Sequence, residues 1–290
     1  MNLTRTSLPA ALVLLAACVT EEDDVIAPIG VAMEGSTPVG LEVLPYTGNA
    51  PVTTIARTVN AWGAAVPSAP EEIVVGGSVE SLSIDGLGYG RITVEQVGVT
   101  EILGGEAPAE VVALSGSWPG FGVQRGEVPL GDAVFAASAP SGVALASASE
   151  VWWVGADMPA HRVLQWPEGE LISGMRSGNA DSDGLPDLVV WGGSTVIMLR
   201  GRPGGGFAWG GGWQSPGNAA VGASLGDANL DSAEDIAVVW AIANGDSMME
   251  ILTGDGIGGF SGIPVPLSDC LLYTSPSPRD QRGSRMPSSA

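Results

Sequence analysis

Short apolar segments separated by glycine- and aspartate-rich turns recur along the chain. Two stretches, 178–191 (GNADSDGLPDLVVW) and 226–240 (GDANLDSAEDIAVVW), each place an acidic loop directly before an apolar strand. A second apolar strand follows in each case, at Thr195–Leu199 and at Met248–Leu252, and a glycine-rich turn then leads into a phenylalanine. Because these segments are short, β-branched and bounded by turn residues, the pattern predicts strands and not helices.

The pattern repeats at an interval of about 47 residues. The acidic loops that begin at Asn179 and Asp227 are 48 residues apart, and steps of 47 back from Asn179 reach Gly131-Asp132 and Ile84-Asp85. Neither earlier point carries the acidic loop, and residues 38–84 have the length of one more unit without its motif. The apolar strands expected after the two earlier points are Arg91–Val94, Val97–Ile102, Val143–Ala146 and Val151–Val154.

A period of 40–50 residues with several short strands per unit is typical of propeller blades, which must stack because no unit buries its own sheet faces. We therefore expect an all-β fold, an incomplete β-propeller of about four to five four-stranded blades over residues 38–269. A β-sandwich or a β-solenoid remains open as an alternative. With 43 Gly and 21 Pro beside 45% apolar residues, the composition suits a turn-rich fold with a substantial core.

The N-terminus has the features of an export signal. In residues 1–17, the apolar run Leu8–Ala17 is too short to span a bilayer and is typical of a secretory signal peptide. The run ends in Leu-Ala-Ala-Cys18, which resembles the lipobox of bacterial lipoproteins. That resemblance implies that Cys18 is lipidated and that residues 18–37 form an acidic tether. An ordinary signal peptide with a chance cysteine is the alternative.

The C-terminus resembles translated cloning sequence. Cys270–Asp280 resembles the translation of a transposase end followed by a sequencing adapter, and Ser284–Ala290 resembles the flow-cell sequence after it. We therefore expect residues 270–290 to be a disordered artefact and the gene to be truncated, with native protein ending no later than Asp269. A genuine Pro/Ser-rich tail, equally disordered, is the alternative. Without Cys270, no disulfide is expected.

The charge excludes one class of partner. All 11 basic residues are Arg, against 32 acidic residues, for a net charge of −21. No nucleic acid is expected to bind, because nothing here could neutralise a phosphate backbone. Acidity suits cations or basic partners, or it simply keeps an exported protein soluble.

The acidic loops carry a resemblance to a known family. The pattern Gly-Asp-x-Asn-x-Asp-x-x-x-Asp, followed by apolar strands and a Gly-Gly-Phe turn, resembles the FG-GAP/VCBS repeats of integrin-α-like β-propellers. The match is good at 178–207 and 226–260 and faint at 85–166. Members of that family usually close a ring of seven blades, which implies that about two blades are missing here.

The resemblance also implies a calcium ligand set in each loop. In the family loop the side chains at positions one, three, five and nine bind calcium, together with the carbonyl at position seven. The first site would therefore use Asn179, Asp181, Asp183, Leu185 and Asp187. The second would use Asp227, Asn229, Asp231, Ala233 and Asp235.

Elementary electrostatics supports a cation at these loops independently. Three carboxylates within nine residues, without a basic residue among them, repel by roughly 1–4 kcal/mol per close pair, and a divalent cation reverses that repulsion. Zinc is disfavoured because the loops lack Cys and His, and magnesium because it prefers a rigid octahedron. At position six the first loop has Gly184, but the second has Ser232, which would be strained at positive φ. Asx turns with solvated acids are the alternative.

Catalytic patterns are weak in this chain. Gly222–Gly226 matches the G-x-S-x-G nucleophile elbow, but the only histidine, His161, precedes it, and we expect that residue at the surface or a blade edge. Gly254–Gly259 matches a dinucleotide fingerprint in spacing alone and is expected to be a hairpin turn. Trp152-Trp153 and the pair Trp191 with Trp240 are expected to pack between blades, the alternative being a sugar-binding platform.

These observations predict a calcium-braced lipoprotein β-propeller, exported to the cell envelope, at the outer membrane or the cell surface. It would act as a non-enzymatic binding or adhesion module for an unknown protein or glycan ligand and would touch the membrane through its lipid anchor only. Two alternatives stay open: the N-terminal fragment of a secreted enzyme whose catalytic part is missing, and a structural envelope component.

Overall fold

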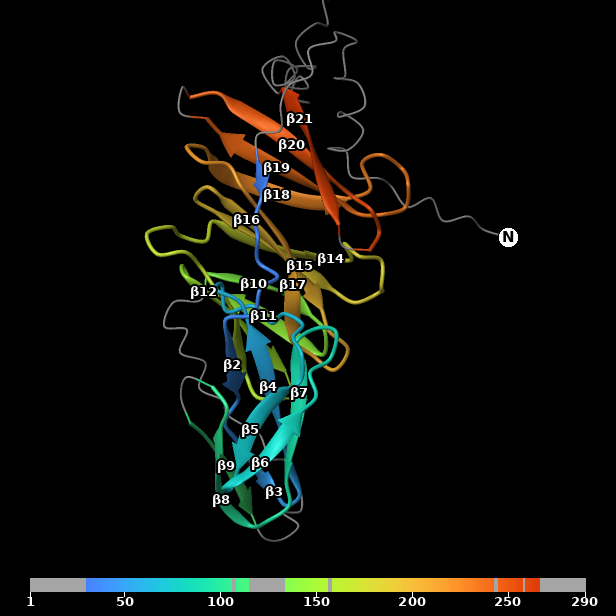
Figure 1. Ribbon diagram of the computed structural model, residues 1–290. Helices are drawn as coiled ribbons and strands as arrows, with labels where there is room; N and C mark the ends of the chain where they lie inside the picture. Colours follow the sequence, from blue (N-terminus) through green and yellow to red (C-terminus); the bar gives the residue numbers. More distant parts are fainter. Residues whose placement is uncertain are drawn as a thin grey trace, which may run out of the picture.

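The computed structural model describes residues 30–105, 108–114, 134–155, 158–242, 245–257 and 259–266. Within these residues the chain forms twenty-one β-strands in five sheets and no helix (Figure 1). The expected all-β, incomplete propeller-like fold is therefore confirmed. In that same part of the chain we find no helix with the length and apolar character needed to cross a membrane. The signal peptide, Cys18 and residues 270–290 lie outside the described residues.

Three sheets are antiparallel four-stranded meanders, in which each strand pairs with the next along the chain. The first blade consists of β10 (Phe135–Ala139), β11 (Gly142–Ala146), β12 (Glu150–Gly155) and β13 (His161–Gln165). The second blade consists of β14 (Gly174–Gly178), β15 (Asp187–Gly192), β16 (Thr195–Gly201) and β17 (Phe207–Gln214). The third blade consists of β18 (Ala219–Gly226), β19 (Asp235–Ala241), β20 (Ser247–Gly254) and β21 (Phe260–Pro266).

The three blades stack face to face along the long axis of the molecule (Figure 1). Their first strands lie side by side, since β14 contacts both β10 and β18. In β15 every residue is buried, because both faces of the second blade are covered by neighbours. Trp191 and Trp240 belong to the apolar cluster between the second and third blades, so their expected role in packing is confirmed. Trp153 is likewise fully buried, in the core that the first blade shares with the second.

Residues 40–114 are arranged differently from a blade. Two sheets with non-sequential strand order face each other across their own apolar core, so this segment is a small sandwich. One sheet has the order β2 (Gly40–Val43), β4 (Val52–Val59) and β7 (Tyr89–Val94). The other has the order β3 (Tyr46–Asn49), β9 (Ala109–Leu114), β8 (Gly98–Leu103), β5 (Glu71–Val75) and β6 (Ser78–Leu82).

The repeat unit expected to begin at Ile84-Asp85 therefore does not form one sheet. Its strands are present as β7 and β8, but β7 pairs with β4 while β8 pairs with β9 and β5 in the opposite sheet. The chain crosses between the sheets twice here, once from β6 to β7 and again from β7 to β8. At the first crossing, Asp85 Oδ1 accepts hydrogen bonds from the N–H groups of Leu87 and Tyr89, both at 2.9 Å. This tight Asx turn carries the chain from one sheet of the sandwich to the other.

The N-terminal end of the described chain is held against the blades. β1 (Val31–Ala32) pairs with β17 as a fifth strand of the second blade. The N–H of Gly30 donates to Glu250 of the third blade, with distances of 3.1 and 3.3 Å to its two carboxylate oxygens. Residues 30–32, which belong to the expected acidic tether at 18–37, are thus docked on two blades.

A buried polar cluster joins the sandwich to the blades. His161 lies in β13, the edge strand of the first blade, as one form of the expectation had it, but it is only 2% exposed, so a surface location is wrong. Its ring packs against Tyr89 of the sandwich and Trp153 of the first blade, with centroid distances of 6.3 and 5.5 Å. The hydroxyl of Tyr89 donates a hydrogen bond of 2.7 Å to the carbonyl oxygen of Phe207 in the second blade. Three sheets therefore meet at this histidine. The pattern of apolar residues could not predict its burial, because histidine is polar.

Burial makes His161 a source of acid sensitivity. Mainly through desolvation, and further through the charge of Arg57, the pKa of His161 is lowered to about 3. In the unfolded chain the pKa is about 6.5, so as pH falls from about 6.5 to 3 the unfolded state takes up a proton that the folded state refuses. This contribution to stability is complete above pH 6.5 and is lost progressively on acidification.

We expect wild type to lose about 2–3 kcal/mol more unfolding free energy between pH 7 and pH 4.5 than His161→Phe, which lacks the titrating group. Urea unfolding of both proteins at the two pH values measures this difference, and the carboxylates common to both cancel. Equal losses in the two proteins would contradict the assignment.

Candidate functional site

The two acidic loops occupy equivalent places in neighbouring blades. Residues 179–186 join β14 to β15 in the second blade, and residues 227–234 join β18 to β19 in the third. In each loop the last predicted ligand is the first residue of the second strand. Those two residues, Asp187 and Asp235, are 0% and 1% exposed, whereas most of each loop is open to solvent.

The buried aspartates tie three parts of each blade together. Asp187 Oδ1 accepts a hydrogen bond of 2.7 Å from the N–H of Gly201 at the end of the third strand. Asp235 Oδ1 accepts the equivalent bond of 2.9 Å from Gly254. The other carboxylate oxygen accepts from the loop, from Asp181 N at 3.1 Å and from Asn229 N at 3.3 Å. Each aspartate thus links its loop and second strand to the third strand.

The remaining loop side chains fold inward through Asx turns at matching positions. The side chain at position one accepts a hydrogen bond from the N–H of position six. In the first loop Asn179 accepts from Gly184, and in the second Asp227 accepts from Ser232, both at 3.0 Å. The carboxylate at position five accepts from the N–H of position seven, at 2.7 Å in the first loop and 2.8 Å in the second. Position three accepts from the N–H of position five in both loops. The two loops therefore share one conformation.

That conformation requires left-handed backbone at two positions. Position four has φ of 61° at Ser182 and 64° at Leu230, and position six has φ of 86° at Gly184 and 78° at Ser232. Only Gly184 adopts this region without a steric penalty, since the Cβ of other residues crowds the backbone there. The expected strain at Ser232 is thus present.

Burial perturbs the acids of the first loop. Desolvation raises the pKa of Asp187 to about 6, against the opposing effect of the hydrogen bond from Gly201. Desolvation likewise raises the pKa of Asp181. Both shifts mean that the negative charge is held at unfavourable places, which a nearby cation would relieve.

The donor chemistry of the loops fits calcium. At its predicted ligand positions each loop offers three carboxylates, one amide and one backbone carbonyl, all oxygen donors of the kind that calcium prefers. Each carboxylate has about four lone-pair sites. A hydrogen bond from one backbone N–H therefore leaves the carboxylate able to bind a cation as well. In the described part of the chain, no three Asp, Glu, His or Cys side chains are grouped as they would be around a bound metal ion.

A contact between the blades joins the two loops. Glu234, at position eight of the second loop, accepts a hydrogen bond of 2.7 Å from the N–H of Asn179, the first residue of the first loop. Gly178 permits this approach, because a Cβ at that position would lie 2.5 Å from the Glu234 carboxylate oxygen. Sequence reasoning missed Glu234, since its partner lies 55 residues away and the repeat has Pro186 at the matching position.

The other residues singled out in the sequence lie outside this site. Ser224 of the elbow-like motif is in the middle of β18, paired with Ala237. Gly254 ends β20, and the N–H of Asp255 donates a hydrogen bond of 2.9 Å to the carbonyl oxygen of Gly259 in the turn that leads to β21, as expected. The predicted lipidation site, Cys18, is outside the described residues.

Comparison of the chain with protein-family models, with curated proteins and with solved structures finds no match in any of the three. The chemical reading of the site therefore depends on its own residues.

The strain at position six can be tested by matched substitutions. We expect Ser232→Gly to stabilise the protein by about 0.5–1 kcal/mol, because glycine removes the Cβ penalty at positive φ. Ser232→Ala keeps the Cβ and should leave the free energy of unfolding nearly unchanged. Urea denaturation distinguishes them, and a Gly variant no more stable than the Ala variant would contradict the assigned backbone.

The bridge between the blades yields a second expectation. Glu234→Ala should lose about 1 kcal/mol of unfolding free energy, because the N–H of Asn179 loses a charged acceptor at a partly solvated position. Glu234→Gln retains an acceptor oxygen and should lose less than half as much. If both variants unfold at the wild-type urea concentration, the hydrogen bond makes no net contribution.

Proposed function

We propose that this chain is an exported, lipid-anchored module whose propeller-like blades are braced by calcium and which binds another molecule at the cell surface. The observation that carries the proposal is the repetition of one acidic loop, with the same hydrogen bonds and left-handed positions, at the same place in two neighbouring blades. A conformation kept in duplicate despite backbone strain and buried charge is best explained by a shared ligand.

In the first loop the ion would be held by the side chains of Asn179, Asp181, Asp183 and Asp187 with the carbonyl of Leu185. In the second loop the corresponding residues are Asp227, Asn229, Asp231, Asp235 and Ala233. When bound, calcium supplies positive charge that offsets the repulsion among the carboxylates. The protein's own contribution is to hold the position-nine aspartate rigidly on the second and third strands, so that binding energy stabilises the blade.

A binding role agrees better with the described residues than a catalytic one. The only histidine, His161, is enclosed by aromatic rings, and its low pKa keeps it neutral at physiological pH. Ser224 lies within a regular strand and not at a strand-to-helix turn. The expected export, lipid anchor and surface location rest on the sequence of residues 1–18.

Calcium titration of the full chain tests the bracing directly. For a dissociation constant of about 10⁻⁴–10⁻³ M, 10 mM calcium should add about 1.4–2.7 kcal/mol per site, which corresponds to roughly 3–10 °C in melting temperature. Differential scanning calorimetry with calcium and with chelator measures this shift. Equal melting temperatures in the two solutions would refute the proposal.

Substitutions at position five provide the specificity control. The double variant Asp183→Asn, Asp231→Asn keeps the oxygen that accepts from position seven, so the apo fold should persist while most of the calcium response is lost. The control Glu101→Gln, Glu110→Gln removes two exposed carboxylates that face each other across β8 and β9. This control should retain the full calcium response.

A further inference from the structure

Two neighbouring pockets with Arg91 and Arg202 in common lie at the junction between the sandwich and the blades; together they are called the junction cavity, and singly its smaller and larger lobes. The smaller lobe, about 390 Å³, lies between the sheet residues Thr53, Ile55 and Arg91 and the blade residues Met158, Pro159 and Arg202. The larger lobe, about 510 Å³, shares Arg91 and Arg202 and is also lined by apolar side chains of the sandwich, including Ile73 and Ile92. Both volumes fall within the roughly 300–1,000 Å³ typical of small-molecule sites.

The charge of the smaller lobe is opposite to that of the protein. The chain has 32 acidic and 11 basic residues, yet the described lining of this lobe has two arginines and no acid. The larger lobe is balanced, since Glu80 and Asp85 also line it. A negatively charged group would therefore be placed in the smaller lobe, and the neutral part of the same ligand in the larger one.

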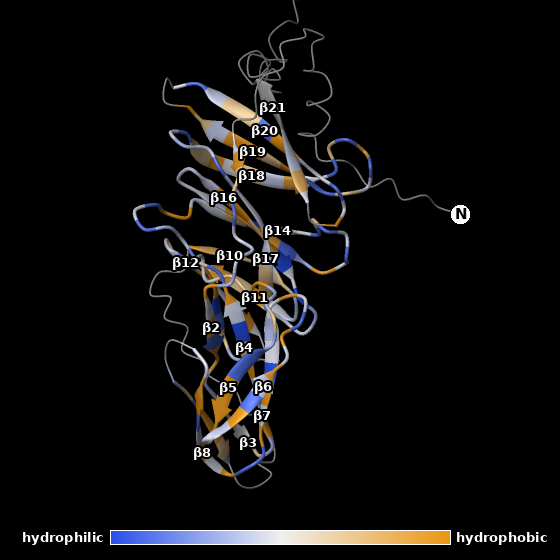
Figure 2. Ribbon diagram, viewed as in Figure 1, coloured by the Kyte–Doolittle hydropathy of each residue, from blue (hydrophilic) through white to orange (hydrophobic). Residues whose placement is uncertain are grey.

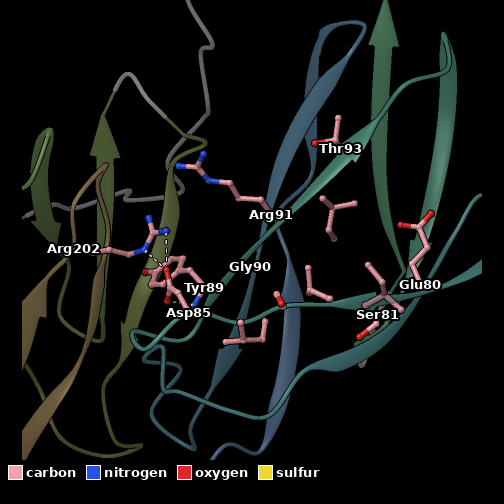
Figure 3. Close-up of a pocket in the computed structure, with 13 residues that line it drawn as sticks. Glu80, Ser81, Asp85, Tyr89, Gly90, Arg91, Thr93 and Arg202 are labelled. Atoms are coloured by element: carbon pink, nitrogen blue, oxygen red, sulfur yellow. Dashed lines mark hydrogen bonds and ion pairs between the residues drawn. The ribbon is translucent and has the colours of Figure 1, made fainter.

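The two arginines differ in how they are held. Arg202 is only 8% exposed, its Nη2 lies 3.1 Å from Asp85 Oδ2, and its guanidinium lies 4.3 Å above the centre of the Tyr89 ring. Arg91 is exposed on β7, and its side chain extends toward Arg202 (Figure 3). Within the described residues, no carboxylate lies in ion-pair range of Arg91. One arginine is thus preorganised and the other is available.

A third arginine lies behind the junction. Arg57 is fully buried in the same sheet, opposite Tyr89, and its Nε donates a hydrogen bond of 2.8 Å to Glu42. Arg57 and Arg202 are thus each paired with one carboxylate, whereas Arg91 has no ion-pair partner among the described residues.

The lining indicates which anion fits. Guanidinium groups bind carboxylates through paired N–H donors. Ile55, Met158 and Pro159 offer an apolar wall, and Ser81, Ser83 and Thr93 carry hydroxyls around the larger lobe. A ligand with a carboxylate, several hydroxyls and an apolar C–H face matches this combination. A long polyanion does not, because the net charge of −21 would repel it.

We infer that the junction cavity binds a uronic acid unit flanked by neutral sugars in a glycan, with its carboxylate on Arg91 and Arg202 and the adjoining neutral sugar in the larger lobe. This inference deepens the proposed binding function by naming the class of ligand, and it rests on that function. The calcium loops take no part in it.

The experiment titrates the full chain with a disaccharide of one glucuronate and one galactose and with its methyl ester, which keeps the rings and removes the charge, by isothermal titration calorimetry. We expect the charged disaccharide to bind at least tenfold more tightly than the ester. Arg91→Gln should weaken binding at least tenfold without changing the melting temperature. Arg176→Gln, which removes an exposed arginine of β14 that lines neither lobe, should bind as wild type does.

Several results would overturn the inference. These are absence of binding, equal binding of the ester, equal loss in the two arginine variants, or equally tight binding of triglutamate, which would assign the site to acidic peptides. Titration in both calcium and chelator separates this inference from the bracing proposal. Binding of the charged disaccharide without a calcium-dependent melting shift would leave the cavity assignment standing and remove the bracing; the reverse pattern would remove only the cavity assignment.

Discussion

The second and third blades depend on one interaction, the buried carboxylate at the start of the second strand. Asp187 and Asp235 each accept hydrogen bonds from the loop before them and from a glycine at the end of the third strand. An unpaired carboxylate in such a place would cost several kcal/mol, so these N–H donors are necessary for burial. Once they are in place, the loop, the strand and its neighbour form one rigid unit, and the loop oxygens are held together as a consequence.

The strength of this arrangement follows from how the blades stack. The second and third blades share an apolar cluster that includes Trp191, Trp213 and Trp240. A tilt of either blade would therefore expose apolar surface of both. Glu234 then links the second loop to the first through one hydrogen bond, from the backbone N–H of Asn179. The two acidic loops are therefore parts of one edge of the molecule, and ions bound there would stabilise an interface as well as a turn.

Sequence periodicity was informative where local pattern and fold agree. The strands at 143–146, 151–154, 195–199 and 248–252 fall within β11, β12, β16 and β20, because alternation and turn residues act over short distances. The same periodicity was misleading at Asp85, where a strand-like pattern is preserved but the chain crosses between two sheets. Whether a strand pairs with its neighbour in sequence depends on long-range packing, which a repeat length does not encode.

The residues of the candidate site and the junction likewise fall into those that local sequence predicts and those that it does not. Positions one to nine of each loop could be read from spacing, since backbone conformation and carboxylate placement are local. Spacing could not predict the roles of five other residues, because each acquires its environment from a distant segment. These residues are Glu234, His161, Arg57, Arg91 and Arg202. Figure 2 shows the mixture of hydropathies in the sandwich strands, where polar residues such as Arg57 occupy interior positions that apolar patterning would assign to other side chains.

The central claim, that the duplicated loops hold calcium, is tested most directly by a high-resolution crystal structure of the full chain grown in millimolar calcium. We expect one density peak in each loop, about 2.3–2.6 Å from the oxygens of positions one, three, five, seven and nine. Two well-ordered loops without such peaks would contradict it.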